Sequence, residues 1–196
     1  MSFGDRRSTM RGTPAAILFD LDGTLALKWE PALLDGRLAA LQQLSVPLAI
    51  VTNQGGIHAR YGWLARGDPE RAVAYPTVVS LLERLTAVTR QLPMISRTYA
   101  AFYVGHDDYQ LPPDTADVYE TLPTGTPFHG SWSPEWRKPR PEMLRQACTD
   151  LGVAPSSALM VGDREDDAGA AAALGMRFVP AGEKPWQANF LSPRNY

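Results

Sequence analysis

Short apolar runs alternate along the chain with longer stretches in which apolar residues recur at helical spacing. The runs suited to strands covered on both faces are residues 15–19, 47–51, 100–104, 158–161 and 177–179. The helical stretches are residues 31–44, 77–92, 141–151 and 167–174. This alternation predicts an α/β fold, a Rossmann-like doubly wound parallel sheet with helices on both faces.

Two segments follow neither pattern, and we expect them to be loops. They are residues 56–76, with scattered glycines, and residues 105–137, with several prolines. The short interval between the first two predicted strands leaves room for a helix but for only a minimal cap, so an open site is expected. Residues 1–14 are polar and are expected to form a loose leader, with residues 15–196 as a single domain.

The composition excludes several classes of protein. The 196 residues are 44% hydrophobic and carry a net charge of -2, which allows one core and gives no overall charge for binding nucleic acid or membranes. Cys148 is the single cysteine, so an internal disulfide and a zinc site of several thiolates are excluded. No apolar run approaches the roughly 20 residues needed to span a bilayer. We therefore expect a cytoplasmic monomer with no membrane partner.

Polar residues that can take part in chemistry follow three of the predicted strands. They are Asp20 and Asp22 after the first strand, Thr52 and Asn53 after the second, and Asp163 after the fourth. Because the carboxyl ends of parallel strands lie at one edge of the sheet, we expect these side chains to share one site.

Asp20 and Asp22 are two residues apart, so their side chains are expected to point to the same side of an extended segment. At a separation of about 4 Å and an effective dielectric near 20, two carboxylates repel each other by roughly 4 kcal/mol. A bound cation would offset this repulsion, and oxygen ligands favour Mg²⁺. The expected metal ligands are Asp20, Asp163 and the main-chain carbonyl of Asp22.

The same groups are suited to hydrolysis of a phosphomonoester. Asp20 can attack phosphorus and form an aspartyl-phosphate. Asp22 can protonate the departing alcohol and later activate water. Thr52 and Asn53 offer neutral hydrogen-bond donors to the phosphoryl oxygens, and Lys138 offers a positive charge.

Each of these residues also has a simpler interpretation. The acids at 20–22 could belong to an ordinary turn, and Lys138 could be an exposed lysine. Thr52 and Asn53 could cap a helix. The acids at 163–167 could stabilise the start of a helix. Complementary groups at three separate strand ends favour a common site over these interpretations taken together.

Four motifs resemble, in order, those of the haloacid dehalogenase (HAD) superfamily. They are Phe-Asp-Leu-Asp-Gly-Thr-Leu at 19–25, Val-Thr-Asn-Gln-Gly-Gly at 51–56, Arg-Lys-Pro-Arg-Pro-Glu-Met at 137–143 and Val-Gly-Asp-Arg-Glu-Asp-Asp at 161–167. The second and third are similar to the class III branch, which holds histidinol-phosphate phosphatase, D,D-heptose 1,7-bisphosphate phosphatase and polynucleotide 3'-phosphatase. The resemblance covers the chain from residue 15 to about residue 180.

The resemblance implies Mg²⁺ as the cofactor and a role for each matching residue. The roles are nucleophile for Asp20, acid/base for Asp22, phosphate binding for Thr52 and Lys138, contact with substrate or phosphate for Asn53 and Arg137, metal binding for Asp163, and support of the metal or the lysine for Asp167.

One departure from the sugar-phosphate and histidinol-phosphate members concerns zinc. Those members commonly carry a zinc-binding loop of cysteines and a histidine between the second and third motifs. This segment contains His106 and His129 and no cysteine, so no structural zinc is expected.

Local charge and aromatic residues bear on the substrate. Residues 57–97 hold six arginines and three acids, and Trp63, Trp132 and Trp136 could stack on a base or sugar or pack the loops onto the sheet. Acids between residues 107 and 120 disfavour a continuous nucleic-acid track. A small phosphorylated metabolite is therefore the first expected substrate, and a DNA 3'-phosphate end is the second. A non-catalytic protein that binds a phosphorylated ligand is the alternative from another class.

Overall fold

The computed structural model describes residues 13–104 and 115–182, and the structural statements below concern these residues. Its centre is a seven-stranded sheet in the order β4-β5-β3-β2-β1-β6-β7. The strands are β1 (Ile17–Phe19), β2 (Leu48–Asn53), β3 (Ile95–Ala101), β4 (Val118–Thr121), β5 (Pro127–Ser131), β6 (Leu159–Gly162) and β7 (Arg177–Pro180). All neighbouring strands are parallel except β4, which pairs with β5 in antiparallel orientation. The predicted Rossmann-like α/β fold is therefore confirmed.

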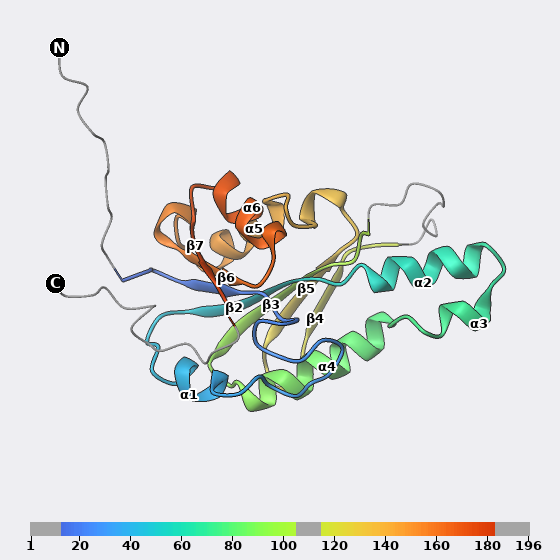
Figure 1. The fold of residues 1–196 in the computed structure, drawn as a ribbon, viewed down its shortest axis with the longest axis horizontal. Coiled ribbons are helices and arrows are strands. Elements are labelled where there is room, and N and C mark those ends of the chain that lie inside the picture. Colours follow the sequence, from blue (N-terminus) through green and yellow to red (C-terminus); the bar gives the residue numbers. More distant parts are fainter. Residues whose placement is uncertain (1–12, 105–114, 183–196) are drawn as a thin grey trace, which may run out of the picture.

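Helices cover both faces of this sheet (Figure 1). On one face lie α1 (Arg37–Leu41) and α4 (Val78–Gln91), and on the other lie α5 (Glu142–Asp150) and α6 (Glu165–Ala173). Helix α2 (Gly56–Ala65) follows β2 and leads into the short α3 (Pro69–Ala72). Single turns of 3-10 helix, η1 (Pro134–Trp136) and η2 (Pro155–Ser157), precede α5 and β6. Among the described helices, none has the length and apolar character that crossing a membrane requires.

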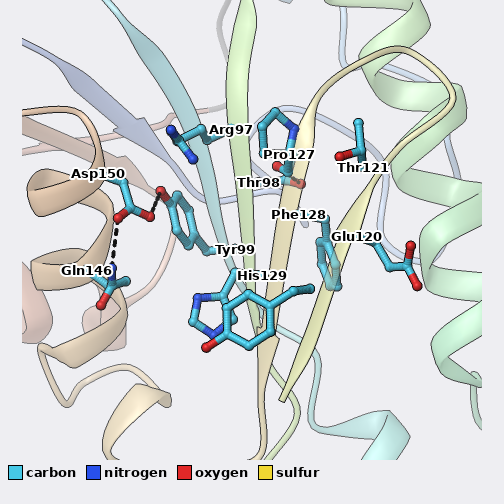
Figure 2. Close-up of a pocket in the computed structure, with 11 residues that line it drawn as sticks. Arg97, Thr98, Tyr99, Glu120, Thr121, Pro127, Phe128, His129, Gln146 and Asp150 are labelled. Atoms are coloured by element: carbon cyan, nitrogen blue, oxygen red, sulfur yellow. Dashed lines mark hydrogen bonds between the residues drawn. The ribbon is translucent and has the colours of Figure 1, made fainter.

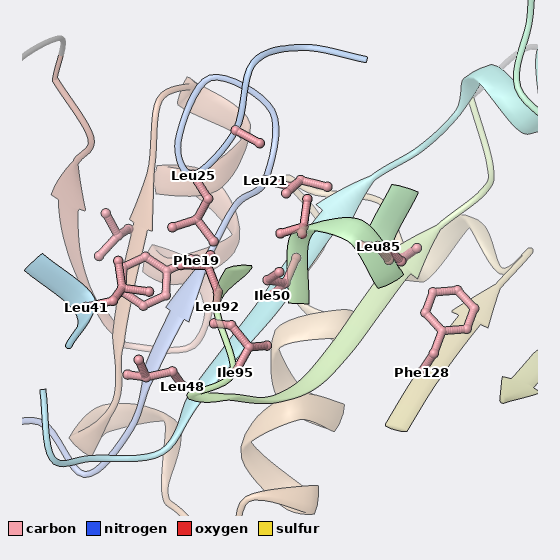
Figure 3. Packing of buried hydrophobic residues seen from close by; sticks show 14 of the residues in the cluster. Phe19, Leu21, Leu25, Leu41, Leu48, Ile50, Leu85, Leu92, Ile95 and Phe128 are labelled. Atoms are coloured by element: carbon pink, nitrogen blue, oxygen red, sulfur yellow. The ribbon is translucent and has the colours of Figure 1, made fainter. Parts of the chain in front are cut away.

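Two apolar clusters attach the helices to the sheet. Phe19, Ile50 and Leu85 belong to the cluster on the α4 side (Figure 3). Leu18 and Met143 belong to the cluster on the α5 side. Neighbouring residues of β1 therefore face opposite clusters, as expected of a strand covered on both faces. Each fully buried side chain of this size contributes roughly 2 kcal/mol to stability, so the strand that ends at the site is firmly held.

The expectation of loops at 56–76, and over the described residues 115–137 of the segment 105–137, was wrong; residues 105–114 lie outside the described residues. The first segment forms α2 and α3, and the second includes β4, β5 and η1. The buried positions of α2 are Ile57, His58 and Gly62, so its buried face shows no apolar stripe in the sequence. Strand β4 lies at the edge of the sheet and none of its residues is fully buried, which removes the apolar alternation.

Other predicted boundaries also differ from the observed ones. The helix expected at 31–44 is shorter, since helix is formed only by α1. Leu33 instead pairs with Ala26 in an isolated bridge, and Gly36, with a φ of 75°, precedes the first helical residue. The strand expected at 100–104 is β3, whose earlier start is obscured in the sequence by polar residues near Arg97. The helices expected at 77–92, 141–151 and 167–174 correspond to α4, α5 and α6.

Candidate active site

The predicted site residues lie together beyond the carboxyl ends of β1, β2 and β6. Strand order reverses at β1, which has β2 on one side and β6 on the other. A reversal of this kind leaves a crevice at the edge of the sheet. A cavity of ≈ 480 Å³ occupies this crevice. The predicted residues that line it are Asp20, Asp22, Thr52, Asn53, Arg137, Lys138, Asp163 and Asp167.

Asp20 is the deepest acid of the first motif. It is only 5% exposed, and its main-chain N–H donates to the carbonyl of Val161 over 2.9 Å, which fixes it between β1 and β6. Its Oδ1 accepts a hydrogen bond of 2.7 Å from Nζ of Lys138. Burial raises the pKa of Asp20 to about 6, although Lys138 acts in the opposite direction and Asp167 raises it further. Ionisation of this carboxyl group is therefore less favourable than it would be in water.

Lys138 connects two buried acids. Its Nζ lies 2.7 Å from Asp20 Oδ1 and 2.6 Å from Asp167 Oδ1, and it donates to the carbonyl of Val51 over 2.8 Å. Burial opposes the charge on Lys138, but the two carboxylates outweigh burial and raise its pKa. Since the residue is 1% exposed, its interpretation as an exposed surface lysine was wrong.

The third motif is attached to the end of β2. The amide of Asn53 donates to the carbonyl of Lys138 and accepts from its N–H, each over 3.0 Å. Both polar atoms of this side chain therefore hold the main chain of the lysine. Neither Thr52 nor Asn53 caps α2, because the N-cap residue is Gly55.

Arg137 lies beside the same strand end. Its Nη1 donates to the carbonyl of Tyr103 over 3.1 Å, and a Cβ at Gly55 would approach Nη1 to 3.0 Å. Burial lowers the pKa of Arg137. The guanidinium is half-buried and lines the cavity, where a charged group of the substrate could reach it.

Three carboxylates offer oxygens for a metal ion. Asp20, Asp163 and Asp167 each provide one oxygen, and these oxygens lie within 4.8 Å of one another. Asp163 packs against Gly23, whose φ of 78° and missing side chain leave room for the carboxylate. Burial raises the pKa of Asp163, and Asp167 raises it further. Such a set of hard oxygens fits Mg²⁺.

Asp167 differs from the other two acids in this group. Its Oδ1 pairs with Lys138, and its Oδ2 accepts from the main-chain N–H of Arg164 over 3.1 Å. Both of its oxygens are therefore already bound to protein groups. This arrangement suits a residue that orients the lysine better than it suits a metal ligand.

Asp22 is held by residues that were not among the predicted site residues. Its Oδ1 accepts from Nη2 of Arg84 over 2.7 Å and from the main-chain N–H of Trp29 over 3.2 Å. Its Oδ2 accepts from Nε2 of Gln54 over 2.8 Å, and the same nitrogen lies 3.0 Å from Thr52 Oγ1. Gln54 stands inside the second motif and could have been found there. No local pattern marks Arg84, which is 62 residues away from its partner.

Some of the described tryptophans are buried and others are partly or largely exposed. Trp132 and Trp136 are 8% and 6% exposed and pack against the sheet, so they do not form an open stacking surface. Trp63 is half-buried, with Arg71 4.4 Å from its ring centre. Trp29, which sequence reasoning did not identify, is 53% exposed and lines the cavity.

A larger hollow, of ≈ 700 Å³, lies on the α5 side of β3, β5 and β4 (Figure 2). Asp150 there accepts hydrogen bonds of 2.8 Å from the hydroxyl of Tyr99 and from Nε2 of Gln146. The ring of His129 lies 4.1 Å from that of Tyr119. In this larger hollow, Asp150 is exposed and its side-chain partners are neutral, whereas in the smaller cavity the buried Asp20, Lys138 and Asp167 contact one another. Convergence of this kind, rather than volume, identifies the candidate active site.

Comparisons with known proteins bear on the motifs and on the fold. A family model described as HAD-hydrolase-like matches residues 135–180, which contain the third and fourth motifs. Comparison with the curated proteins gives no match. The chain is similar to the solved structure of D,D-heptose 1,7-bisphosphate phosphatase from B. bronchiseptica complexed with magnesium and phosphate. The sequence identity is 21%, the TM-score is 0.54, and the match covers 84% of this chain and 78% of that one.

A second solved structure is that of a HAD-superfamily hydrolase, subfamily IA, variant 1, from Geobacter sulfurreducens PCA. Its sequence identity is 16%, its TM-score is 0.47, and the match covers 85% of this chain and 89% of that one. The B. bronchiseptica structure has the higher TM-score of the two and shares its fold with this chain. The family-model match agrees with the resemblance of the third and fourth motifs to HAD-like hydrolases, and the B. bronchiseptica structure shows a shared fold.

Proposed function

We propose that the chain is a magnesium-dependent phosphatase that hydrolyses a phosphomonoester through an aspartyl-phosphate on Asp20. The observation that supports this most is the buried ion pair of Asp20 and Lys138 at a strand end, in a cavity that Asp22 and Asp163 also line. A fold likeness to a phosphatase complexed with magnesium and phosphate adds support of a coarser kind.

The reaction would take two steps. In the first, a carboxylate oxygen of Asp20 attacks phosphorus, the ester P–O bond breaks, and the leaving oxygen takes a proton from Asp22. In the second, Asp22 takes a proton from water, the water oxygen attacks phosphorus, and the bond to Asp20 breaks. Inorganic phosphate leaves, and both side chains return to their starting states.

The surrounding residues would prepare these steps. Lys138 holds Asp20 Oδ1 and leaves the second carboxylate oxygen for attack on phosphorus. The hydroxyl of Thr52 accepts from Gln54, so its own hydrogen can be donated to a phosphoryl oxygen. When bound to Asp20, Asp163 and the main-chain carbonyl of Asp22, Mg²⁺ would neutralise charge on the transferring phosphoryl group.

A small phosphorylated metabolite is the substrate class we propose. A cavity of ≈ 480 Å³ lies within the size range of small-molecule sites. Lys28, Arg137 and Arg164 line it and would attract an anionic ligand. Trp29 offers an exposed ring at the same cavity.

Phosphate release from a panel of compounds tests this proposal. The panel holds sugar phosphates, histidinol phosphate, nucleotides and a 3'-phosphorylated oligonucleotide, each assayed with Mg²⁺. We expect a small phosphate ester to be hydrolysed fastest, EDTA to stop the reaction and Mg²⁺ to restore it. Preferred hydrolysis of the oligonucleotide would replace the substrate class with a DNA end. Full activity in metal-free buffer would show that the reaction needs no metal ion. Binding of a phosphorylated compound without any phosphate release would indicate a non-catalytic protein.

A further inference from the structure

Arg84 reaches from α4 to Asp22 of the first motif and to the segment that follows this motif, and it binds three acceptors there. Its Nη2 lies 2.7 Å from Asp22 Oδ1 and 2.9 Å from the carbonyl of Leu27, and its Nε lies 2.9 Å from the carbonyl of Glu30. The side chain is 9% exposed. One guanidinium group therefore joins the acid to the segment that follows it.

Helix α4 gives Arg84 a fixed base. Leu81 and Leu85, on either side of it in the sequence, are buried in the apolar cluster on this face of the sheet. The side chain of Thr77 caps the start of the helix by accepting from the main-chain N–H of Ser80 over 3.0 Å. A donor on a packed and capped helix can hold a carboxylate more accurately than one on a loop.

The remaining nitrogen of Arg84 argues against a purely stabilising role. Its Nη1 is buried and has no hydrogen-bond partner among the described residues. A buried donor without a partner lowers stability, so this ion pair is not arranged for maximum stability.

We propose that Arg84 is a positioning residue for Asp22, an inference that rests on the proposed phosphatase function. Arg84 Nη2 and the main-chain N–H of Trp29 both donate to Oδ1, so this oxygen is fixed as an acceptor. Oδ2 accepts one hydrogen bond, from Nε2 of Gln54, so it keeps a free lone pair on which the proton that the acid gives and takes can be carried. Oδ2 faces Gln54, whose Nε2 also contacts Thr52 Oγ1, so the proton-carrying oxygen lies beside the proposed phosphate site.

This role makes the effect of Arg84 depend on the leaving group. As Asp20 attacks and the ester P–O bond breaks, an alkyl alcohol needs the proton from Asp22 Oδ2, whereas 4-nitrophenolate leaves without a proton. Since kcat/KM reports the steps up to release of the alcohol, it isolates proton donation from the later water attack. Loss of a well-placed acid should therefore lower kcat/KM for alkyl phosphates selectively.

The experiment compares 4-nitrophenyl phosphate with the best alkyl phosphate of the panel. Arg84→Ala should lower kcat/KM for the alkyl ester by about 10-fold to 100-fold, toward the usual magnitude of acid catalysis, and for the aryl ester by less than about threefold. Arg84→Lys keeps a positive donor and should recover part of the loss. Arg90→Ala, which removes an exposed arginine from the last turn of the same helix, is the matched control and should behave like the wild type.

A double-mutant cycle tests whether Arg84 acts through Asp22. In an Asp22→Asn background, adding Arg84→Ala should lower kcat/KM for the alkyl ester by less than about threefold, because the acid is already absent. Should Arg84→Ala fail to fold, as judged by circular dichroism, Arg84→Lys supplies the same comparison of leaving groups.

Equal losses on both esters, or full additivity in the cycle, would overturn the positioning role, as would wild-type rates in Arg84→Ala. A wild-type protein that releases phosphate from no compound would instead refute the proposed function, and this inference with it. An active wild type with losses that do not depend on the leaving group would refute the role of Arg84 alone.

Discussion

The larger hollow over β3, β5 and β4 and the smaller one beyond β1 are bounded by different kinds of contact. In the larger hollow, Asp150 lies at the surface and accepts from neutral donors on Tyr99 and Gln146. In the smaller one, Asp20 and Lys138 are buried and charged groups face each other. The larger volume reflects an uncovered strip of the sheet. The buried charges are costly to maintain, so they indicate chemistry more strongly than volume does.

The titrating groups of the two hollows also differ. Burial, together with Asp150, raises the pKa of Tyr99, so this phenol stays protonated at neutral pH. Burial raises the pKa of Asp20 to about 6, which is close enough to neutrality for small changes in its surroundings to alter its charge. As far as the described residues go, the smaller hollow alone combines an acid of raised pKa with a possible metal site.

Among substitutions in the two hollows, Asp20→Asn in the smaller one should cause the largest loss of activity. The amide is isosteric and can still accept from Lys138, but it cannot attack phosphorus, so turnover should fall by at least about 10⁴-fold while the fold is kept. Phosphate release and circular dichroism measure the two effects. Activity within tenfold of the wild type would contradict the assignment of the nucleophile.

Lys138→Met should have the next largest effect. It leaves the carboxylates of Asp20 and Asp167 buried without their shared cation, which should lower the free energy of unfolding by about 3–5 kcal/mol and kcat by about 100-fold or more. Thermal unfolding and phosphate release follow the two quantities. Arg140→Met, at a neighbouring and half-exposed arginine, should change neither appreciably. Similar results for the two variants would show that the buried pair is not special.

The pH dependence of stability should reveal Asp20 in metal-free buffer. Its pKa is higher in the folded state than in the unfolded state, so the folded protein binds the extra proton and stability is lost as pH rises from about 4 to about 6. Asp20→Asn removes this loss and should be more stable than the wild type by up to about 3 kcal/mol at pH 7.5, with a smaller difference at pH 4.5. Chemical unfolding in EDTA at the two pH values measures it. A variant that is less stable than the wild type at pH 7.5 would reverse the sign and contradict the prediction.

Tyr99→Phe, in the larger hollow, should have the smallest effect. It removes one hydrogen bond to Asp150 and should lower the free energy of unfolding by about 1 kcal/mol, with kcat/KM unchanged within about twofold. Unfolding and the phosphatase assay under the same conditions measure both. A large loss of activity without a loss of stability would mean that the larger hollow also takes part in function.

The positions of the site residues at the ends of β1 and β6 could be predicted because both strands are buried and therefore have a clear apolar sequence. Residues 16–19 and 158–161 are buried and form continuous apolar runs, so the acids that follow them stand out in the sequence. The pairing of Asp167 with Lys138 was open at that stage, because the sequence does not say which group an acid faces. The motifs predicted which residues belong to the site, whereas the contacts between these residues were seen only in the folded structure.

The parts that were missed depend on contacts between distant segments. Arg84 is one arginine among several on its segment, and its importance comes only from the packing of α4 beside the first motif. Strand β4 is exposed at the edge of the sheet, so its residues carry no apolar pattern. Leu33 and Leu34 have helical spacing with later leucines, yet they pack as extended chain against the segment after β1, where Leu34 donates to the carbonyl of Leu25 over 3.0 Å.

Trapping of the covalent intermediate is the decisive measurement. In Asp22→Asn, 4-nitrophenyl phosphate should still phosphorylate Asp20, because its leaving group needs no proton, while water attack is slowed for lack of a base. Acid quenching followed by peptide mass spectrometry should then find one phosphoryl group on the peptide that carries Asp20 and none in the Asp20→Asn, Asp22→Asn double variant. Phosphorylation of another residue, or steady turnover by the wild type with no phosphorylated peptide in either protein, would contradict nucleophilic catalysis by Asp20.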